Sequence, residues 1–206
     1  MRPIISDQEF QDRVRKTQQR MQETGIDLLL AYGNEVEPQF PRYYSDYWPS
    51  FESAGVLIAQ EGDPVLLIGP ESMTYAADRS RIREIRRLSC FRESSNPEYP
   101  GHVMDRFRDA ARDLMNGNPL KRLAIAGYQL IPHFTYEEIT QSLDDDGPYE
   151  VIQGDDLVMS LRMIKSPAEI ECMRYAGNIT ARTFDHVIQN IRPGMTESQV
   201  RGLALG

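Results

Sequence analysis

The sequence has little cysteine, no long hydrophobic run and an excess of negative charge. Its two cysteines, Cys90 and Cys172, are too few for a disulfide framework, so a reducing compartment is expected. No stretch approaches the ~18 apolar residues of a membrane span, and the opening residues MRPIISDQEF lack the apolar core of a signal peptide. The 23 Lys and Arg against 31 Asp and Glu disfavour a binder of nucleic acid or anionic membrane. We therefore expect a soluble, cytoplasmic protein.

Residue patterns typical of a catalytic centre are also missing. His102, His133 and His186 lie far apart, with neither an H-E-x-x-H nor a C-x-x-C spacing. The run from Asp144 to Asp146 lacks the alternating ligand positions of a calcium loop, which favours a solvated turn. The sequence contains no glycine-rich phosphate loop and no G-x-S-x-G nucleophile motif. It therefore predicts neither a catalytic residue nor a metal site in these 206 residues.

Hydrophobic patterning up to Gly154 indicates alternating helices and strands. Ser6 to Thr24 predicts an amphipathic helix, and the apolar run Asp27 to Tyr32 predicts a strand buried on both faces. Ala54–Ala59 and Pro64–Ile68 predict a hairpin. The remaining predicted elements are helices at 71–80, 102–115 and 135–143 and strands within 85–91, 122–126 and 150–152. This order predicts an α/β fold, with a mixed sheet of about six strands and helices on both faces.

The pattern after Gly154 is helical throughout. One short helix is predicted at 155–164, and a second begins after Ser166, with Pro167 at its first position and Glu169 completing a capping box. A third helix is predicted after Thr196. We expect two domains, at residues 1–154 and 155–206. Because an amphipathic final helix needs a surface to pack on, we expect a truncated sequence whose parent chain continues.

Arginines form the one basic cluster. Because Asp78, Glu84 and Glu93 lie among them, local ion pairing on a solvated face is the ordinary interpretation, and an anion or an acidic partner is the alternative. The cluster consists of Arg79, Arg81, Arg83, Arg86, Arg87 and Arg92.

The connection from Asn34 to Phe51 holds three prolines and the only tryptophan, and its aromatic residues concentrate between Phe40 and Phe51. This connection either packs as a core-forming loop or presents a surface to a substrate or partner, since tyrosine and tryptophan gather on loops that bind.

Two motif-bearing segments follow the predicted α/β region. Leu161 to Ala176 reads L-R-M-I-K-S-P-A-E-I-E-C-M-R-Y-A, and Ile191 to Glu197 reads I-R-P-G-M-T-E. These segments resemble the junction between the two domains of the creatinase, prolidase and aminopeptidase P family. The upstream segments D-L-L-L-A-Y-G-N, R-Y-Y-S-D-Y and A-G-V-L-I…P-V-L-L-I-G-P-E are similar, more loosely, to the N-terminal domain of that family. The matching junction positions are Arg162, Lys165, Glu169, Met173, Arg174, Ala176, Pro193, Gly194, Met195, Thr196 and Glu197.

The resemblance implies a ribonuclease H-like N-terminal domain followed by the first helices of a pita-bread catalytic domain. In the peptidases of this family, that second domain binds two divalent metals (manganese, cobalt or zinc) through two Asp, one His and two Glu; creatinase uses the same fold without metal. None of these ligand motifs is present in this chain. The resemblance therefore implies that the chain alone has no cofactor and no catalytic activity.

Three functions remain open on this basis. The first is the non-catalytic part of a Xaa-Pro dipeptidase or aminopeptidase, which shapes the substrate pocket and forms a homodimer. The second is the corresponding part of a creatinase-like or other C–N hydrolase with a small non-peptide substrate. The third is a stand-alone binding module. As substrate-binding residues that reach the pocket of the partner subunit, the resemblance favours Tyr44, Trp48 and Phe51.

Overall fold

The computed structural model describes residues 2–93, 99–144 and 147–205. Its contacts divide the chain into two compact units, Asp7–Ile164 and Met1–Ser6 with Lys165–Gly206. Parts of the predicted loops at 96–101 and 144–148, including two of the three consecutive aspartates, lie outside the described residues. In the part of the chain that is described, no helix combines the length and the apolar character that crossing a bilayer requires.

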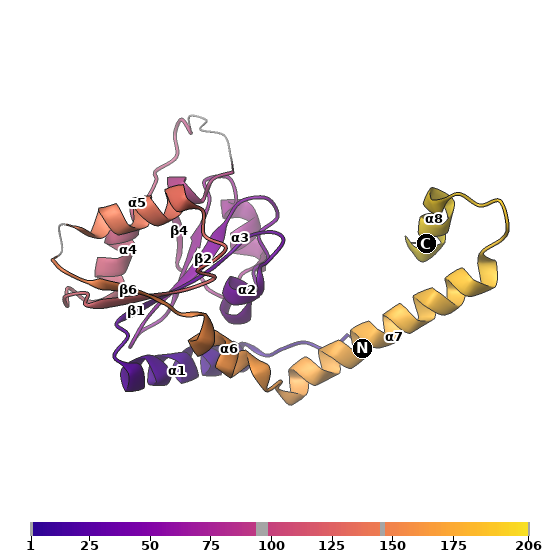
Figure 1. Cartoon of the computed structure of the whole chain (residues 1–206), viewed down its shortest axis with the longest axis horizontal. Helices are drawn as coiled ribbons and strands as arrows, with labels where there is room; N and C mark the ends of the chain where they lie inside the picture. The colour runs from indigo at the N-terminus through magenta and orange to yellow at the C-terminus, as the bar shows by residue number, and fades with distance from the viewer. Residues whose placement is uncertain (1, 94–98, 145–146, 206) are drawn as a thin grey trace. The chain divides into compact units, whose positions relative to one another are not determined.

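A six-stranded mixed sheet forms the centre of the larger unit, as predicted (Figure 1). Its order is β4-β3-β2-β1-β5-β6. The strands are β1 (Leu28–Gly33), β2 (Ala54–Ala59), β3 (Val65–Ile68), β4 (Ile85–Arg87), β5 (Arg122–Ala126) and β6 (Glu150–Gln153). Strand β2 is antiparallel to both neighbours, and the pairs β1–β5, β3–β4 and β5–β6 are parallel.

Helices cover both faces of this sheet, because the apolar strand residues alternate between two cores. Leu29, Ala31 and Ile58 face a core completed by α1 (Asp7–Thr24), α2 (Gln39–Ser45), α3 (Met73–Arg79) and α6 (Asp155–Met163). Leu28 and Leu30 face the opposite core, completed by η1 (Ser89–Phe91), α4 (Phe107–Leu114) and α5 (His133–Leu143). All six residues of β1 are buried, which confirms the prediction of a strand covered on both faces.

Two predicted elements differ from the structure. The connection read as irregular contains α2, whose Pro41 lies in the first turn, where a missing backbone N–H costs no intrahelical hydrogen bond. The helix predicted at 102–115 begins only at Phe107, because Asp105 pairs with the end of β4: it bridges Leu88 and donates its N–H to the Arg87 carbonyl. Tertiary pairing thus shortens the helix.

Helix α6 belongs by its contacts to the larger unit, and its Val158 is fully buried in the core beside β5. The compact unit therefore extends to Ile164, whereas the division into domains at residues 1–154 and 155–206 stays a prediction.

The smaller unit contains α7 (Pro167–Asn190) and α8 (Glu197–Leu205). Ser166 and Glu169 form the predicted capping box at the start of α7, with Pro167 at the first helical position. Thr196 and Gln199 exchange hydrogen bonds at the start of α8, as predicted. Neither helix has a buried residue.

Candidate functional site

The segments that join the strands to the following helices lie at one end of the sheet, where all strands but β2 reach their carboxyl ends. Gly33 at the end of β1 pairs with Ala54 at the start of β2, and Ala54 also pairs with Ile68 at the end of β3. The ends of β4, β5 and β6 lie at the same edge, since each is parallel to its neighbour. We call this the carboxyl edge. In open α/β sheets, ligands bind outside the carboxyl ends of the strands.

Exposed aromatic side chains gather at the carboxyl edge. In the described part of Asp7–Ile164, every exposed aromatic side chain lies in one of two places. It lies in a connection that begins or ends at the carboxyl edge, or in the first turn of the helix that follows such a connection. Arginine guanidinium groups lie over three of the rings: Arg42 over Trp48, Arg79 over Tyr75 and Arg92 over Phe134. The exposed rings are Trp48 (46%), Phe51 (41%), Tyr75 (41%), Tyr128 (38%) and Phe134 (47%).

Trp48 is held in a defined position although it is half exposed. Its indole Nε1 donates a hydrogen bond of 2.8 Å to the carbonyl of Glu35. The guanidinium of Arg42, in the last turn of α2, lies 4.7 Å from the ring centroid, within the range of a cation–π contact. The structure therefore presents part of a positioned Trp48 ring at the surface, three residues before the exposed Phe51.

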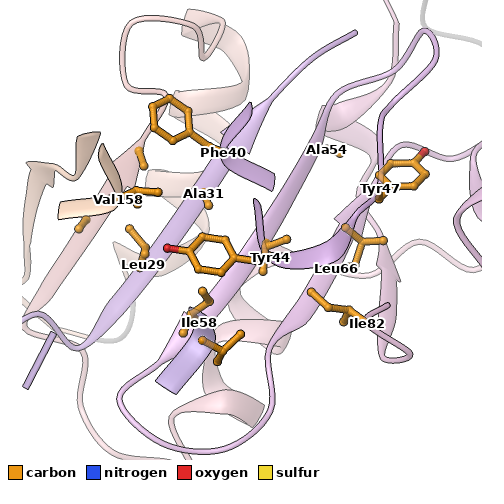
Figure 2. Close-up of a cluster of buried hydrophobic side chains, with 14 of the residues drawn as sticks. Leu29, Ala31, Phe40, Tyr44, Tyr47, Ala54, Ile58, Leu66, Ile82 and Val158 are labelled. Atoms are coloured by element: carbon orange, nitrogen blue, oxygen red, sulfur yellow. The ribbon is translucent and has the colours of Figure 1, made fainter. Parts of the chain in front are cut away.

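Tyr44 does not share this exposure. It is 1% exposed, and its hydroxyl lies 2.9 Å from Thr17 Oγ1 on α1. Figure 2 shows its ring over the sheet among Leu29 and Ile58. Tyr44 is thus a core residue in this structure. The substrate roles predicted for Tyr44, Trp48 and Phe51 stay predictions.

The sequence interpretation missed three of the exposed rings, Tyr75, Tyr128 and Phe134. All three lie outside the aromatic-rich connection that ends at Phe51. Each follows a predicted strand within about ten residues, and segments that follow parallel strands meet at one edge. That strand-end position was the signal available.

The residue that follows Phe51 in the sequence carries a buried carboxylate. Glu52 is 1% exposed, and its carboxylate accepts hydrogen bonds from the hydroxyl of Ser72 at 2.6 Å and from the backbone N–H of Glu71 at 3.2 and 3.3 Å. Burial raises the pKa of the Glu52 carboxyl above its ordinary value of 4.5, with a smaller contribution from the charge of Glu71; the hydrogen bonds oppose the shift.

This raised pKa predicts a pH-dependent stability. A carboxyl with a higher pKa in the folded state stabilises the fold fully below its unfolded pKa, and that contribution is lost as the pH rises through the folded pKa. Glu52→Gln, which is permanently neutral, should therefore gain stability relative to the parent as the pH rises. Urea unfolding of both proteins at several values between about pH 4 and pH 8 measures this. A difference that does not change with pH would contradict it.

The arginine cluster is engaged in local contacts. Arg86 pairs with Glu84, Asp105 and Asp113, and Arg81 pairs with Asp7 and Asp46. Arg79 pairs with Asp78. The guanidinium of Arg83 donates to the Ala77 carbonyl, and the guanidinium of Arg92 donates to the Ser89 carbonyl. The guanidinium of Arg87 lies 3.2 Å from His102 Nδ1. These contacts fit the interpretation as a solvated face with local pairing.

The residues of this chain do not fit the two divalent metals that the family resemblance implies. Within residues 2–93, 99–144 and 147–205, no group of three or more His, Cys, Asp or Glu side chains could hold a metal ion. The three histidines lie on different segments: His102 contacts Arg87, His133 contacts Glu137 and His186 contacts Asn190. We therefore derive no chemical step through a metal.

Comparison with known proteins identifies the class of domain. The model of the creatinase/prolidase N-terminal domain matches residues 13–164, which is most of the chain. The chain therefore belongs to this family, and it is an α/β domain with the creatinase N-terminal fold.

Named relatives are identical to the chain at about a quarter of the aligned positions. The Xaa-Pro aminopeptidase of Escherichia coli is 26% identical over 220 residues, covering 96% of this chain and 48% of the relative. The ectoine hydrolase of Halomonas elongata is 25% identical, covering 94% and 47%. The chain thus spans about half the length of the curated relatives it matches.

Among solved structures, the X-Pro aminopeptidase of Thermotoga maritima superimposes with a TM-score of 0.69 at 24% identity. The match covers 93% of this chain and 47% of that one. At this identity the likeness establishes the fold.

Proposed function

We propose that this chain is the N-terminal, non-catalytic part of a Xaa-Pro dipeptidase or aminopeptidase-type metallohydrolase. In this proposal Trp48 and Phe51 wall the substrate pocket of the partner subunit in a homodimer, and the reaction takes place in a domain that follows Gly206. Family membership and the similarity to an enzyme named Xaa-Pro aminopeptidase support the substrate class.

The observation that carries the proposed role is the half-exposed Trp48, held by Glu35 and Arg42, with the exposed Phe51 three residues later at the carboxyl edge. A pocket for a small peptide needs apolar walls that exclude water, and aromatic rings supply them at a low cost in conformational entropy. Trp48 is already fixed by Glu35 and Arg42, so binding would not have to pay for ordering its ring.

The test is Trp48→Ala in the full-length protein, assayed with a Xaa-Pro dipeptide. Truncating a buried interface aromatic costs about 2 kcal/mol or more, so we expect kcat/KM to fall about 30-fold. The melting temperature should change little, because the ring is half exposed in the isolated domain.

Phe134→Ala is the matched control. Phe134 is as exposed as Trp48 and also carries an arginine over its ring, but it belongs to α5 on the opposite face of the sheet. It should leave kcat/KM unchanged. Equal kinetic losses in both variants, or none in Trp48→Ala, would contradict the proposed role.

A second candidate is a C–N hydrolase that acts on a small non-peptide substrate. It is favoured by one observation: the relative named ectoine hydrolase matches the chain at 25% identity, against 26% for the aminopeptidase. Assaying the full-length protein against both a Xaa-Pro dipeptide and ectoine separates the two candidates.

A further inference from the structure

Glu52 joins two segments at the carboxyl edge that are distant in sequence. Through Ser72 and the Glu71 backbone it bonds the end of the 46–53 connection to the turn between β3 and α3. Ser72 occupies the position before α3 where a serine ordinarily caps the helix, yet its side chain makes no cap hydrogen bond. Its hydroxyl is used on Glu52 instead.

Gly69 shows how closely the two segments fit. A Cβ atom at this position would lie within 2.3–2.5 Å of the carbon and both oxygens of the Glu52 carboxyl group. Only glycine leaves room for the carboxylate in its present position, since real Cβ contacts are longer. The turn and the carboxylate are therefore complementary in shape as well as bonded.

The Glu52 carboxylate has no cationic partner in the described part of the chain. The titratable groups that face it are Glu71 and the phenol of Tyr47, with Tyr99 also within electrostatic reach. Tyr47 is fully buried. Burying a carboxylate without a cationic partner lowers the stability of the fold. Glu52 therefore contributes through the geometry that its hydrogen bonds impose on the two segments, and not through a net gain in stability.

The segment that Glu52 anchors is the one that carries the exposed rings. Trp48 is bonded on its N-terminal side, through Glu35 and Arg42. After Trp48, Glu52 carries the first side chain that is hydrogen-bonded to another described residue of the domain. The next is Ser53, whose hydroxyl lies 2.5 Å from that of Tyr32. The position of Phe51 between these bonds thus depends on Glu52.

We propose that Glu52 is a positioning residue: by bonding to the Glu71–Ser72 turn, its carboxylate sets where Trp48 and Phe51 stand at the carboxyl edge. The relevance of this position to a substrate rests on the proposed function. The positioning itself does not, and it can be measured in this chain without any assay of activity.

Trp48 is the only tryptophan, so intrinsic fluorescence reports on this segment alone. We expect Glu52→Ala to raise the acrylamide quenching constant of Trp48 up to about twofold, because a ring that is 46% exposed would move toward full exposure while the domain stays folded. Ser72→Ala, which removes one of the hydrogen bonds, should give a smaller increase. Far-UV circular dichroism establishes that each variant is folded.

Asp27→Ala is the matched control. The Asp27 carboxylate also accepts two backbone hydrogen bonds, from Lys121 at 2.9 Å and Arg122 at 2.8 Å, but it lies at the opposite end of β1. It should destabilise the fold without changing the quenching of Trp48. If Glu52→Ala fails to fold, Ser72→Ala decides the question by the same measurement. Unchanged quenching in the folded variants overturns the proposal.

Kinetics of the full-length protein then separate this inference from the proposed function. If both hold, Ser72→Ala raises KM about threefold or more and leaves kcat unchanged, since the residue acts on binding through Trp48 and Phe51. Quenching that responds while KM does not would leave Glu52 as a positioning residue and contradict the pocket role of the rings. A change in KM with unchanged quenching overturns the positioning.

Discussion

Gly127→Ala is expected to lower the free energy of unfolding by about 3 kcal/mol, because two penalties coincide at this position. Gly127 has a φ of +82°, a conformation that L side chains rarely adopt, and a Cβ atom there would lie 2.5 Å from the Tyr32 carbonyl oxygen. The residue turns the chain after β5 at the carboxyl edge. Urea unfolding monitored by circular dichroism measures the loss.

Gly62→Ala separates the two penalties. Gly62 has the same φ of +82°, but nothing lies within 4 Å of the position where its Cβ would be. Its replacement should cost only the backbone strain, about 1 kcal/mol. Equal losses at the two positions would show that the close approach of Gly127 to β1 is relieved by a small backbone shift.

Tyr44→Ala is expected to cost about 4 kcal/mol of stability, the range for truncating a buried aromatic side chain. Tyr44 is 1% exposed and packs in the core with Leu29 and Ile58 (Figure 2). Its hydroxyl is hydrogen-bonded to the hydroxyl of Thr17. The truncation would both open a cavity and leave the Thr17 hydroxyl without this partner. Thermal and urea unfolding of the variant check this.

Trp48→Ala provides the comparison four residues further along. Because Trp48 is 46% exposed, its truncation should cost about 1 kcal/mol or less. The two variants thus distinguish, within one aromatic stretch, the buried Tyr44, which stabilises the fold, from Trp48, whose ring is partly exposed at the surface. A larger loss for Trp48→Ala than for Tyr44→Ala would reverse this assignment.

Local patterns in the sequence were sufficient for most of the fold. The continuous apolar run before Gly33 predicts a strand buried on both faces, and β1 has that environment. Ser166, Pro167 and Glu169 predict the start of α7 at the position where the capping box forms. These signals are reliable because each depends on residues within one turn or one strand of each other.

Helix α2 shows where such patterns fail. Its seven residues include a proline and three aromatics, which local propensity reads as a connection. The helix forms because Phe40 and Tyr44, four positions apart, both enter the core above β1. The burial of these rings exceeds the weak local preference, and this contribution is visible only when the sheet is assembled.

By itself, the amino-acid sequence determined the α/β class, the order of the strands and of the α-helices other than α2, and the resemblance to a family, since all three are written in short-range patterns and motifs. Only the tertiary structure decided which aromatic residues are core and which are exposed, and it alone brought Glu52 to Gly69 and Ser72. The physical reason is that burial depends on the elements that pack over a residue, and these come from segments far away in the chain.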